Sequence, residues 1–193
     1  MPSERERVPR NSGMFCTEAL REMAGRVADA IANPKMPIGI MIEVPSAAFT
    51  ASLLAREVDF FTIGTNDLIQ YTLAVDRTDE RVSDRYQPLH PAILRLLRQV
   101  RRGAVRAGIP VAVCGEMASD PLLLRLLIGC GLTEFSMTPG ALAVARRVVQ
   151  QTSASQMARI AAKVLTLGTT QEIERFLDDS FDSTGAYTEV PAR

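Results

Sequence analysis

The chain has 193 residues, of which 47% are hydrophobic and 23% are charged, and this composition suits one globular domain with its own core. Acidic and basic residues number 22 each, so no net charge favours binding to nucleic acid or to an anionic membrane. The three cysteines show neither a CxxC nor a metal-ligand spacing, and no apolar run is long enough to span a membrane. We therefore expect a cytoplasmic protein without disulfides.

The two ends of the chain differ in composition from its middle. Residues 1–14 are rich in charge, Pro and Ser, so we expect a disordered segment there, and residues 184–193 are expected to form a flexible tail. The single domain then covers residues 15–183. Its first predicted element is a helix over residues 15–32, with apolar residues at helical spacing: Leu20, Met23, Val27 and Ile31.

From residue 37 onward, apolar strands alternate with amphipathic helices. Strands are predicted at residues 37–44, 59–67, 110–116 and 134–140. Helices are predicted at residues 46–56 with Ser46 as N-cap, at 91–107 between Pro91 and Gly108, at 120–131, and at about 140–150, 153–166 and 170–180. This alternation, with strands apolar along their whole length, predicts an α/β fold whose parallel sheet is covered by helices.

The three longest strands end in polar or reactive side chains. These are Glu43, the pair Asn66 and Asp67, and the pair Cys114 and Glu116. In (β/α) barrels the chemistry lies at the carboxyl ends of the strands. If the strands are neighbours, their polar ends converge on one site.

The carboxylates of Glu43 and Asp67 suit a divalent cation. Two carboxylates from adjacent strands provide the oxygen ligands that Mg²⁺ takes from a protein when substrate and water complete its coordination. Asn66 and Arg77 could donate hydrogen bonds to an anionic substrate. The alternative, equally weighted on these residues alone, is that both carboxylates pair with arginines or cap helices.

Cys114 lies at the end of an apolar strand and precedes a glycine, so its thiol could transfer a proton at the carboxyl end of the sheet. The alternative is a small buried apolar residue, which is also our interpretation of Cys16 and Cys130. His90, the only histidine, precedes the helix at 91–107 and is interpreted as structural. The basic residues of that helix are interpreted as a solvated face: Arg95, Arg98, Arg101, Arg102 and Arg106.

Three segments carry a family resemblance. They read PIGIMIEVPSAAFTASLLAREVDFFTIGTNDLIQYTLAVDRTDE, YQPLHPAILRLLRQV and VAVCGEMASDPLLLRLLIGCGLTEFSM. Over about residues 37–150 they closely resemble the C-terminal part of the Enzyme I family, the phosphoenolpyruvate–protein phosphotransferases. Pyruvate phosphate dikinase and phosphoenolpyruvate synthase share GTNDL and a CG pair, but YTLAVDR and CGEMASD resemble the Enzyme I branch.

The resemblance implies the C-terminal half of a TIM (β/α)₈ barrel and a role for each matching residue. It implies that Glu43 and Asp67 bind Mg²⁺ and that Asn66 and Arg77 contact phosphoenolpyruvate. Cys114 would protonate the enolate that remains after phosphoryl transfer, so that pyruvate is released. In the family this reaction serves a phosphotransferase system, of the sugar or the nitrogen-regulatory branch.

The same resemblance implies partners. The family's phosphohistidine domain, the domain that docks a small carrier protein and the first half of the barrel match nothing in this sequence. We expect the phosphohistidine domain and the carrier protein from a separate chain, and the missing half of the barrel is either supplied in trans or lost by truncation. Alone, the chain is expected to be incomplete or inactive. Because a half-barrel exposes two sheet edges, we also expect a homo-oligomer.

Two other functions remain open. One is a non-catalytic remnant or regulatory module that keeps the phosphoenolpyruvate pocket. The other is a Mg²⁺-dependent lyase of the citrate-lyase type, against which the Cys-Gly-Glu strand end and YTLAVDR argue.

Overall fold

The computed structural model describes residue 25 and residues 36–79 and 81–182. The chain divides into two compact units, Met1–Met36 and Pro37–Arg193, and the fold described below belongs to the second. The predictions for residues 1–14 and 184–193, and that of a helix over 15–32 apart from residue 25, lie outside the described residues.

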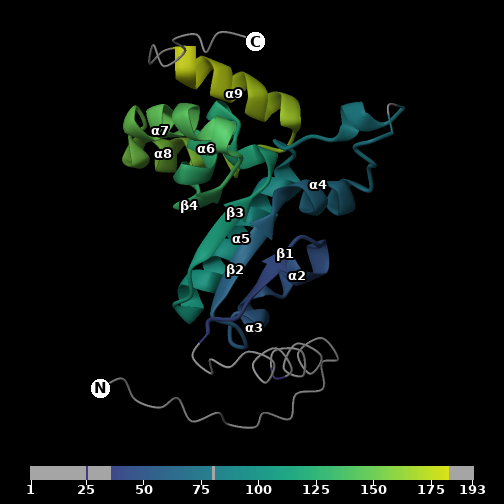
Figure 1. The fold of residues 1–193 in the computed structure, drawn as a ribbon. Helices are drawn as coiled ribbons and strands as arrows, with labels where there is room; N and C mark the ends of the chain where they lie inside the picture. Colours follow the sequence, from purple (N-terminus) through teal and green to yellow (C-terminus); the bar gives the residue numbers. More distant parts are fainter. Residues whose placement is uncertain (1–24, 26–35, 80, 183–193) are drawn as a thin grey trace. The chain divides into compact units, whose positions relative to one another are not determined.

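A four-stranded parallel sheet forms the centre of this unit (Figure 1). Its strands are β1 (Gly39–Ile42), β2 (Phe60–Gly64), β3 (Val111–Cys114) and β4 (Glu134–Ser136), in the order β1-β2-β3-β4. All three pairings are parallel, and each strand lies beside its predecessor in sequence. The predicted α/β fold is confirmed, and this sequential order is that of one half of a (β/α)₈ barrel.

The two faces of the sheet differ in burial. Ile42, Ile63 and Val113 pair across three strands and are fully buried on one face. Helices α2 (Pro45–Phe49), α3 (Ala51–Leu54) and α5 (Pro91–Ala107) pack together, and α5 contacts β2. On the opposite face Met41 remains 49% exposed. Helices therefore cover one face of the sheet in the described residues.

Helix α5 matches its prediction at both ends. It runs from Pro91 to Ala107, with Gly108 as a left-handed C-cap. The predicted apolar face is buried, and the arginines lie on the outer side, where Arg101 Nε also donates to the carbonyl of Gly131 at 2.7 Å. His90 is the N-cap, since its Nδ1 accepts from the Ala92 amide at 3.2 Å, which supports the structural interpretation.

The helix predicted at residues 46–56 is wrong in two respects. Its N-cap is Val44 rather than Ser46, because Pro45 occupies the first turn. It also breaks at Thr50 into α2 and α3. The Thr50 hydroxyl donates to the Ser46 carbonyl at 2.8 Å, a local bond that competes with the regular helical pattern.

The C-terminal helices form a stack on the β4 side of the sheet (Figure 1). They are α6 (Pro121–Gly129), α7 (Leu142–Gln150), α8 (Ala154–Val164) and α9 (Thr170–Asp182). Of the 3₁₀ turns, η1 (Ser83–Arg85) precedes α5, η2 (Glu116–Ala118) follows β3 and η3 (Pro139–Ala141) precedes α7. Helix α6 packs on α7 and α8, and α8 packs on α9. None of the helices in the described part of the chain is long and apolar enough to cross a membrane.

Candidate functional site

The carboxyl ends of β1, β2 and β3 lie side by side, as predicted. Gly64 pairs with Cys114, and Ile42 pairs with Ile63, so Glu43 is level with Gly64. Glu43, Gly64 and Cys114 therefore form one row across three strands. Neighbouring strands lie about 4.8 Å apart, so the backbones of Glu43 and Cys114 lie about 10 Å from each other across the carboxyl ends of the strands.

The end of β2 differs from the prediction in a way that shapes the site. The strand was expected to continue to residue 67, but it ends at Gly64, and helix α4 (Thr65–Leu73) begins at once. Asn66 and Asp67 therefore lie in the first turn of α4. A carboxylate there is favoured by the positive end of the helix dipole.

A close contact holds the end of β3 against this first turn. The buried Thr65 hydroxyl donates to the Cys114 carbonyl at 3.2 Å. Gly115 follows with φ 126°, a conformation that residues with a side chain rarely adopt. A Cβ at Gly115 would strike Thr65 Oγ1 and approach Asn66 Oδ1 to 3.0 Å. Glycine is thus required here for the approach of β3 to α4.

The carboxylate of Glu43 lies over β2. Its Oε2 is 3.0 Å from the position that a Cβ on Gly64 would occupy. Within residues 36–79 and 81–182, neither Glu43 nor Asp67 pairs with an arginine or caps a helix. Both side chains are partly exposed, so both carboxylates are accessible to an ion.

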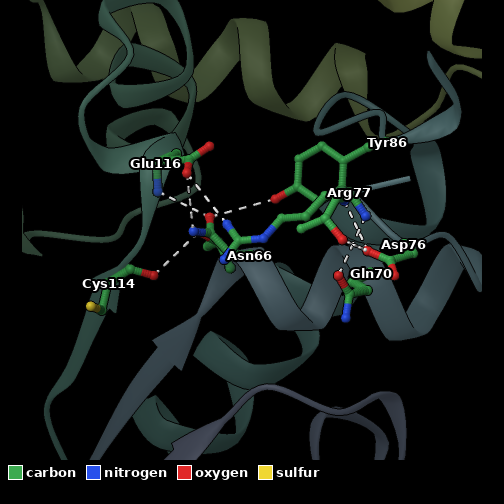
Figure 2. Close-up of polar contacts among 9 residues, drawn as sticks. Asn66, Gln70, Asp76, Arg77, Tyr86, Cys114 and Glu116 are labelled. Carbon is green, nitrogen blue, oxygen red and sulfur yellow. Dashed lines mark hydrogen bonds and ion pairs between the residues drawn. The ribbon is translucent and has the colours of Figure 1, made fainter. Parts of the chain in front are cut away.

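Asn66 is the centre of a hydrogen-bond network (Figure 2). Its Oδ1 accepts from the backbone amide of Glu116 at 3.1 Å and from the Tyr86 hydroxyl at 3.5 Å. Its Nδ2 donates to Glu116 Oε1 at 3.5 Å. Because both acceptor contacts require an oxygen, the amide presents Nδ2 as a donor toward Glu116 Oε1.

Arg77 joins the network from the loop after α4. Its backbone amide donates to Gln70 Oε1 at 3.5 Å, and its Nη1 donates to Glu116 Oε1 at 3.4 Å. The guanidinium and the Asn66 amide therefore meet at one carboxylate oxygen. Charged and amide donors that converge in this way form a binding site for an anion.

Tyr86 is half-buried beside these charges. Burial, together with the nearby Glu116 carboxylate, raises the pKa of its hydroxyl to about 12, while Arg77 opposes the shift. The hydroxyl therefore stays protonated at neutral pH and can act as a donor to Asn66.

The structure places Cys114 at this edge but separates its thiol from the network. Its carbonyl accepts from Thr65, and its sulfur points away from the Arg77–Glu116 pair (Figure 2). Cys130, the C-cap of α6, behaves as expected of an unreactive thiol, since burial raises its pKa to about 11. Cys16 lies outside the described residues.

Two residues of the network were not predicted as site residues. Glu116 was recognised only as a polar strand end, and its contacts with Asn66 and Arg77 depend on the turn at Gly115. Tyr86 reaches Asn66 from 20 residues downstream. It is the first residue of the family segment YQPLHPAILRLLRQV, but neither this resemblance nor the spacing of the sequence was used to assign it a role.

The candidate ligands for Mg²⁺ are the carboxylates of Glu43 and Asp67. Among the described residues, no group of three or more His, Cys, Asp or Glu side chains could hold a metal ion. Glu43 supplies hard carboxylate oxygens directly after β1, and Asp67 supplies them from the first turn of α4, directly after β2. Mg²⁺ is commonly held by one or two carboxylates with substrate oxygens and water. This pair therefore fits a magnesium ion that is bound together with an oxygen-rich substrate.

Comparisons with known proteins agree with the resemblance. The family described as PEP-utilising enzyme, PEP-binding domain matches residues 15–154. A phosphoenolpyruvate-protein phosphotransferase of Bacillus sp. (strain S) is 48% identical over 164 residues, which cover 85% of this chain and 28% of that protein. The one from Geobacillus stearothermophilus is 47% identical over the same shares.

A third relative, the phosphoenolpyruvate-protein phosphotransferase of Cupriavidus necator, is 57% identical over 110 residues, which cover 57% of this chain and 19% of the relative. The chain thus spans 28% or less of the length of these relatives.

Proposed function

Because this chain belongs to the PEP-utilising enzymes through their PEP-binding domain, we propose that it binds phosphoenolpyruvate at the carboxyl ends of β1, β2 and β3. In this proposal the chain is the substrate-binding part of a phosphoenolpyruvate-protein phosphotransferase. The single observation that carries it is the convergence of Asn66 Nδ2 and Arg77 Nη1 on one anionic oxygen, Glu116 Oε1. The phosphate or carboxylate of phosphoenolpyruvate would bind the same donors.

Glu43 and Asp67 would hold Mg²⁺ beside this anion site. The ion would neutralise negative charge that develops on the phosphate during transfer. Gly64 leaves the Glu43 carboxylate room to lie over β2, and the first turn of α4 presents Asp67. These two positions would keep both carboxylates within reach of one ion.

Cys114 would supply the proton. When the phosphoryl group leaves phosphoenolpyruvate for a histidine, the enolate of pyruvate remains. The thiol of Cys114 would donate its proton to C3, so that a C–H bond forms, the S–H bond breaks, and pyruvate and a thiolate result. Because the thiol points away from the Asn66 network, we expect its rotamer to change when substrate binds.

The phosphoryl acceptor is expected outside this sequence. The only histidine, His90, caps α5 through Nδ1. We expect a phosphohistidine domain and a carrier protein as its partners, in the cytoplasm, as parts of a sugar phosphotransferase system. Incubation of the purified chain with labelled phosphoenolpyruvate should give no stable phosphorylation, and a labelled chain would contradict this.

Self-association is part of the same proposal. In the described residues β1 and β4 each pair with one strand only, and Met41 is exposed on the less covered face. Unpaired edges and apolar surface favour a second copy. Light scattering should give a mass above that of the 21.1 kDa monomer, whereas a monomer at all concentrations would argue against it.

Calorimetry tests the site directly. Wild type should bind phosphoenolpyruvate more tightly with Mg²⁺ than without it. The Glu43→Ala/Asp67→Ala double variant should lose this dependence on Mg²⁺. Glu174→Ala/Asp178→Ala is the matched control, because it removes two exposed carboxylates from α9. Equal binding by wild type and the first double variant would reject the proposed site.

A further inference from the structure

Glu116 makes two kinds of contact with the anion-binding residues. Its backbone amide donates to Asn66 Oδ1 at 3.1 Å, which orients the amide. Its side-chain Oε1 accepts from Asn66 Nδ2 at 3.5 Å and from Arg77 Nη1 at 3.4 Å. The backbone of residue 116 thus helps to build the site, while its carboxylate occupies it (Figure 2).

The carboxylate contacts are weak by geometry. Both distances are at the long end of the range for hydrogen bonds, and the side chain of Glu116 is 75% exposed. Arg77 is 40% exposed, so solvent and salt screen the pair. Such a contact can be broken by a ligand without disturbing the fold.

The contact of Glu116 with Asn66 and Arg77 affects how tightly these donors bind another anion. Asn66 Nδ2 and Arg77 Nη1 are the donors that the proposed substrate would use, and Glu116 Oε1 accepts from both. A second anion near Arg77 must either displace this carboxylate or bind against its negative charge. In both cases Glu116 lowers the affinity for an anionic ligand.

We propose that the Glu116 carboxylate acts as an internal competitor, which covers Asn66 and Arg77 until an anion that carries a phosphate displaces it. The identity of the ligand rests on the proposed function. The competition itself does not, since it concerns any phosphate-bearing anion that reaches these donors. Glu116 would return to the donors after phosphoryl transfer and favour release of the product.

Two substitutions separate competition from positioning. Glu116→Gln removes the charge but keeps a side-chain acceptor, and Glu116→Ala removes the whole carboxylate. Both keep the backbone amide that orients Asn66. If Glu116 competes, both variants bind anions more tightly. If it positions Arg77 for the substrate, Glu116→Ala binds more weakly.

Calorimetric titration of the full chain with inorganic phosphate and with phosphoenolpyruvate plus Mg²⁺ tests the proposal. We expect both Glu116 variants to bind either anion about threefold to tenfold more tightly than wild type, the range for loss of one exposed charge interaction. The gain should shrink as salt is added. Glu174→Gln, which removes one exposed carboxylate from α9, should leave affinity unchanged.

The possible failures are distinguishable. Unchanged or weaker anion binding in both Glu116 variants would overturn the inference, and so would an absence of phosphate binding in all proteins. Tighter binding of inorganic phosphate without any binding of phosphoenolpyruvate would leave the competition in place and reject the proposed function. Arg77→Ala should abolish the gain when combined with Glu116→Gln, and a gain that persists would also overturn the inference.

Discussion

Glu43 lies directly over Gly64, with its Oε2 3.0 Å from the position that a Cβ on residue 64 would occupy. The Cβ of Glu43 and the sulfur of Met41 lie equally close to that position. The backbone of Gly64 has φ −83°, which any residue adopts, so the constraint at this glycine is steric. Because residue 64 has no side chain, the carboxylate of Glu43 can lie over β2 at this position.

We expect Gly64→Ala to weaken Mg²⁺-dependent binding of phosphoenolpyruvate by about tenfold. The added methyl group would push the Glu43 carboxylate away from β2, and crowding of this kind typically costs about 1–3 kcal/mol. Calorimetry gives the affinity, and thermal unfolding shows whether the variant is folded. Gly140→Ala is the control, since no atom lies within 4 Å of a Cβ there. A folded Gly64→Ala protein with wild-type affinity would contradict this role.

The N-cap of α6 should contribute measurably to stability. Asp120 Oδ1 accepts from the backbone amides of Leu122 at 2.9 Å and Leu123 at 2.8 Å. Asp120→Ala leaves both amides without this acceptor and should lower the free energy of unfolding by about 1 kcal/mol. Urea denaturation measures the loss. Asp120→Asn keeps a side-chain oxygen and should lose less, so equal losses in the two variants would argue against capping.

The parts of the fold that follow from local pattern were predictable. Helix α5 has an apolar face on one side and arginines on the other, with Pro91 and Gly108 at its limits, and its bounds were predicted to the residue. The four strands lie where they were predicted, but each is shorter than its prediction. In β2 the reason is Thr65, whose bond to the Cys114 carbonyl helps to fix the start of α4. That bond joins residues 49 positions apart, and no local propensity encodes it.

The candidate site also has a part that could be predicted from local pattern and a part that could not. Glu43, Asn66, Asp67 and Cys114 follow apolar runs, so their convergence could be expected from parallel strands in sequence order. The contact of Tyr86 with Asn66 depends on the path of a long loop. The approach of Glu116 to Arg77 depends on the left-handed turn at Gly115. Neither the path of a loop nor the geometry of a turn follows from hydrophobic periodicity. The sequence therefore identified Asn66 and Arg77 as hydrogen-bond donors but did not identify Glu116 as their acceptor.

Cys130 should react slowly with thiol reagents. Burial raises its pKa to about 11, although Arg101 and Arg98 oppose the shift, so at pH 8 only about one thiol in a thousand is ionised. In a Cys16→Ser/Cys114→Ser background, the rate of maleimide labelling should rise about tenfold per pH unit below that pKa. The urea-unfolded chain, in which the thiol regains its ordinary pKa, serves as the control. Rapid labelling of the folded protein at neutral pH would contradict the burial of this thiol.

Tyr86 should make stability depend on alkaline pH. Its pKa is raised to about 12 in the folded chain, first by burial and then by Glu116, whereas a tyrosine in the unfolded chain titrates near pH 10. Between these values the unfolded state has lost the proton and the folded state still holds it. The contribution of Tyr86 to the free energy of unfolding is therefore fully present below about pH 10 and falls as pH rises toward about 12.

Urea denaturation between about pH 9 and pH 11 should show this decline in wild type and a smaller one in Tyr86→Phe, which has no hydroxyl to ionise. Tyr71→Phe is the matched control, because Tyr71 is 56% exposed. Absorbance of the phenolate provides a second measurement. In Glu116→Gln the pKa of Tyr86 should fall, since its second cause is removed. A Tyr86 pKa that does not respond to Glu116→Gln would mean that the two side chains are farther apart in solution than their shared contacts with Asn66 place them.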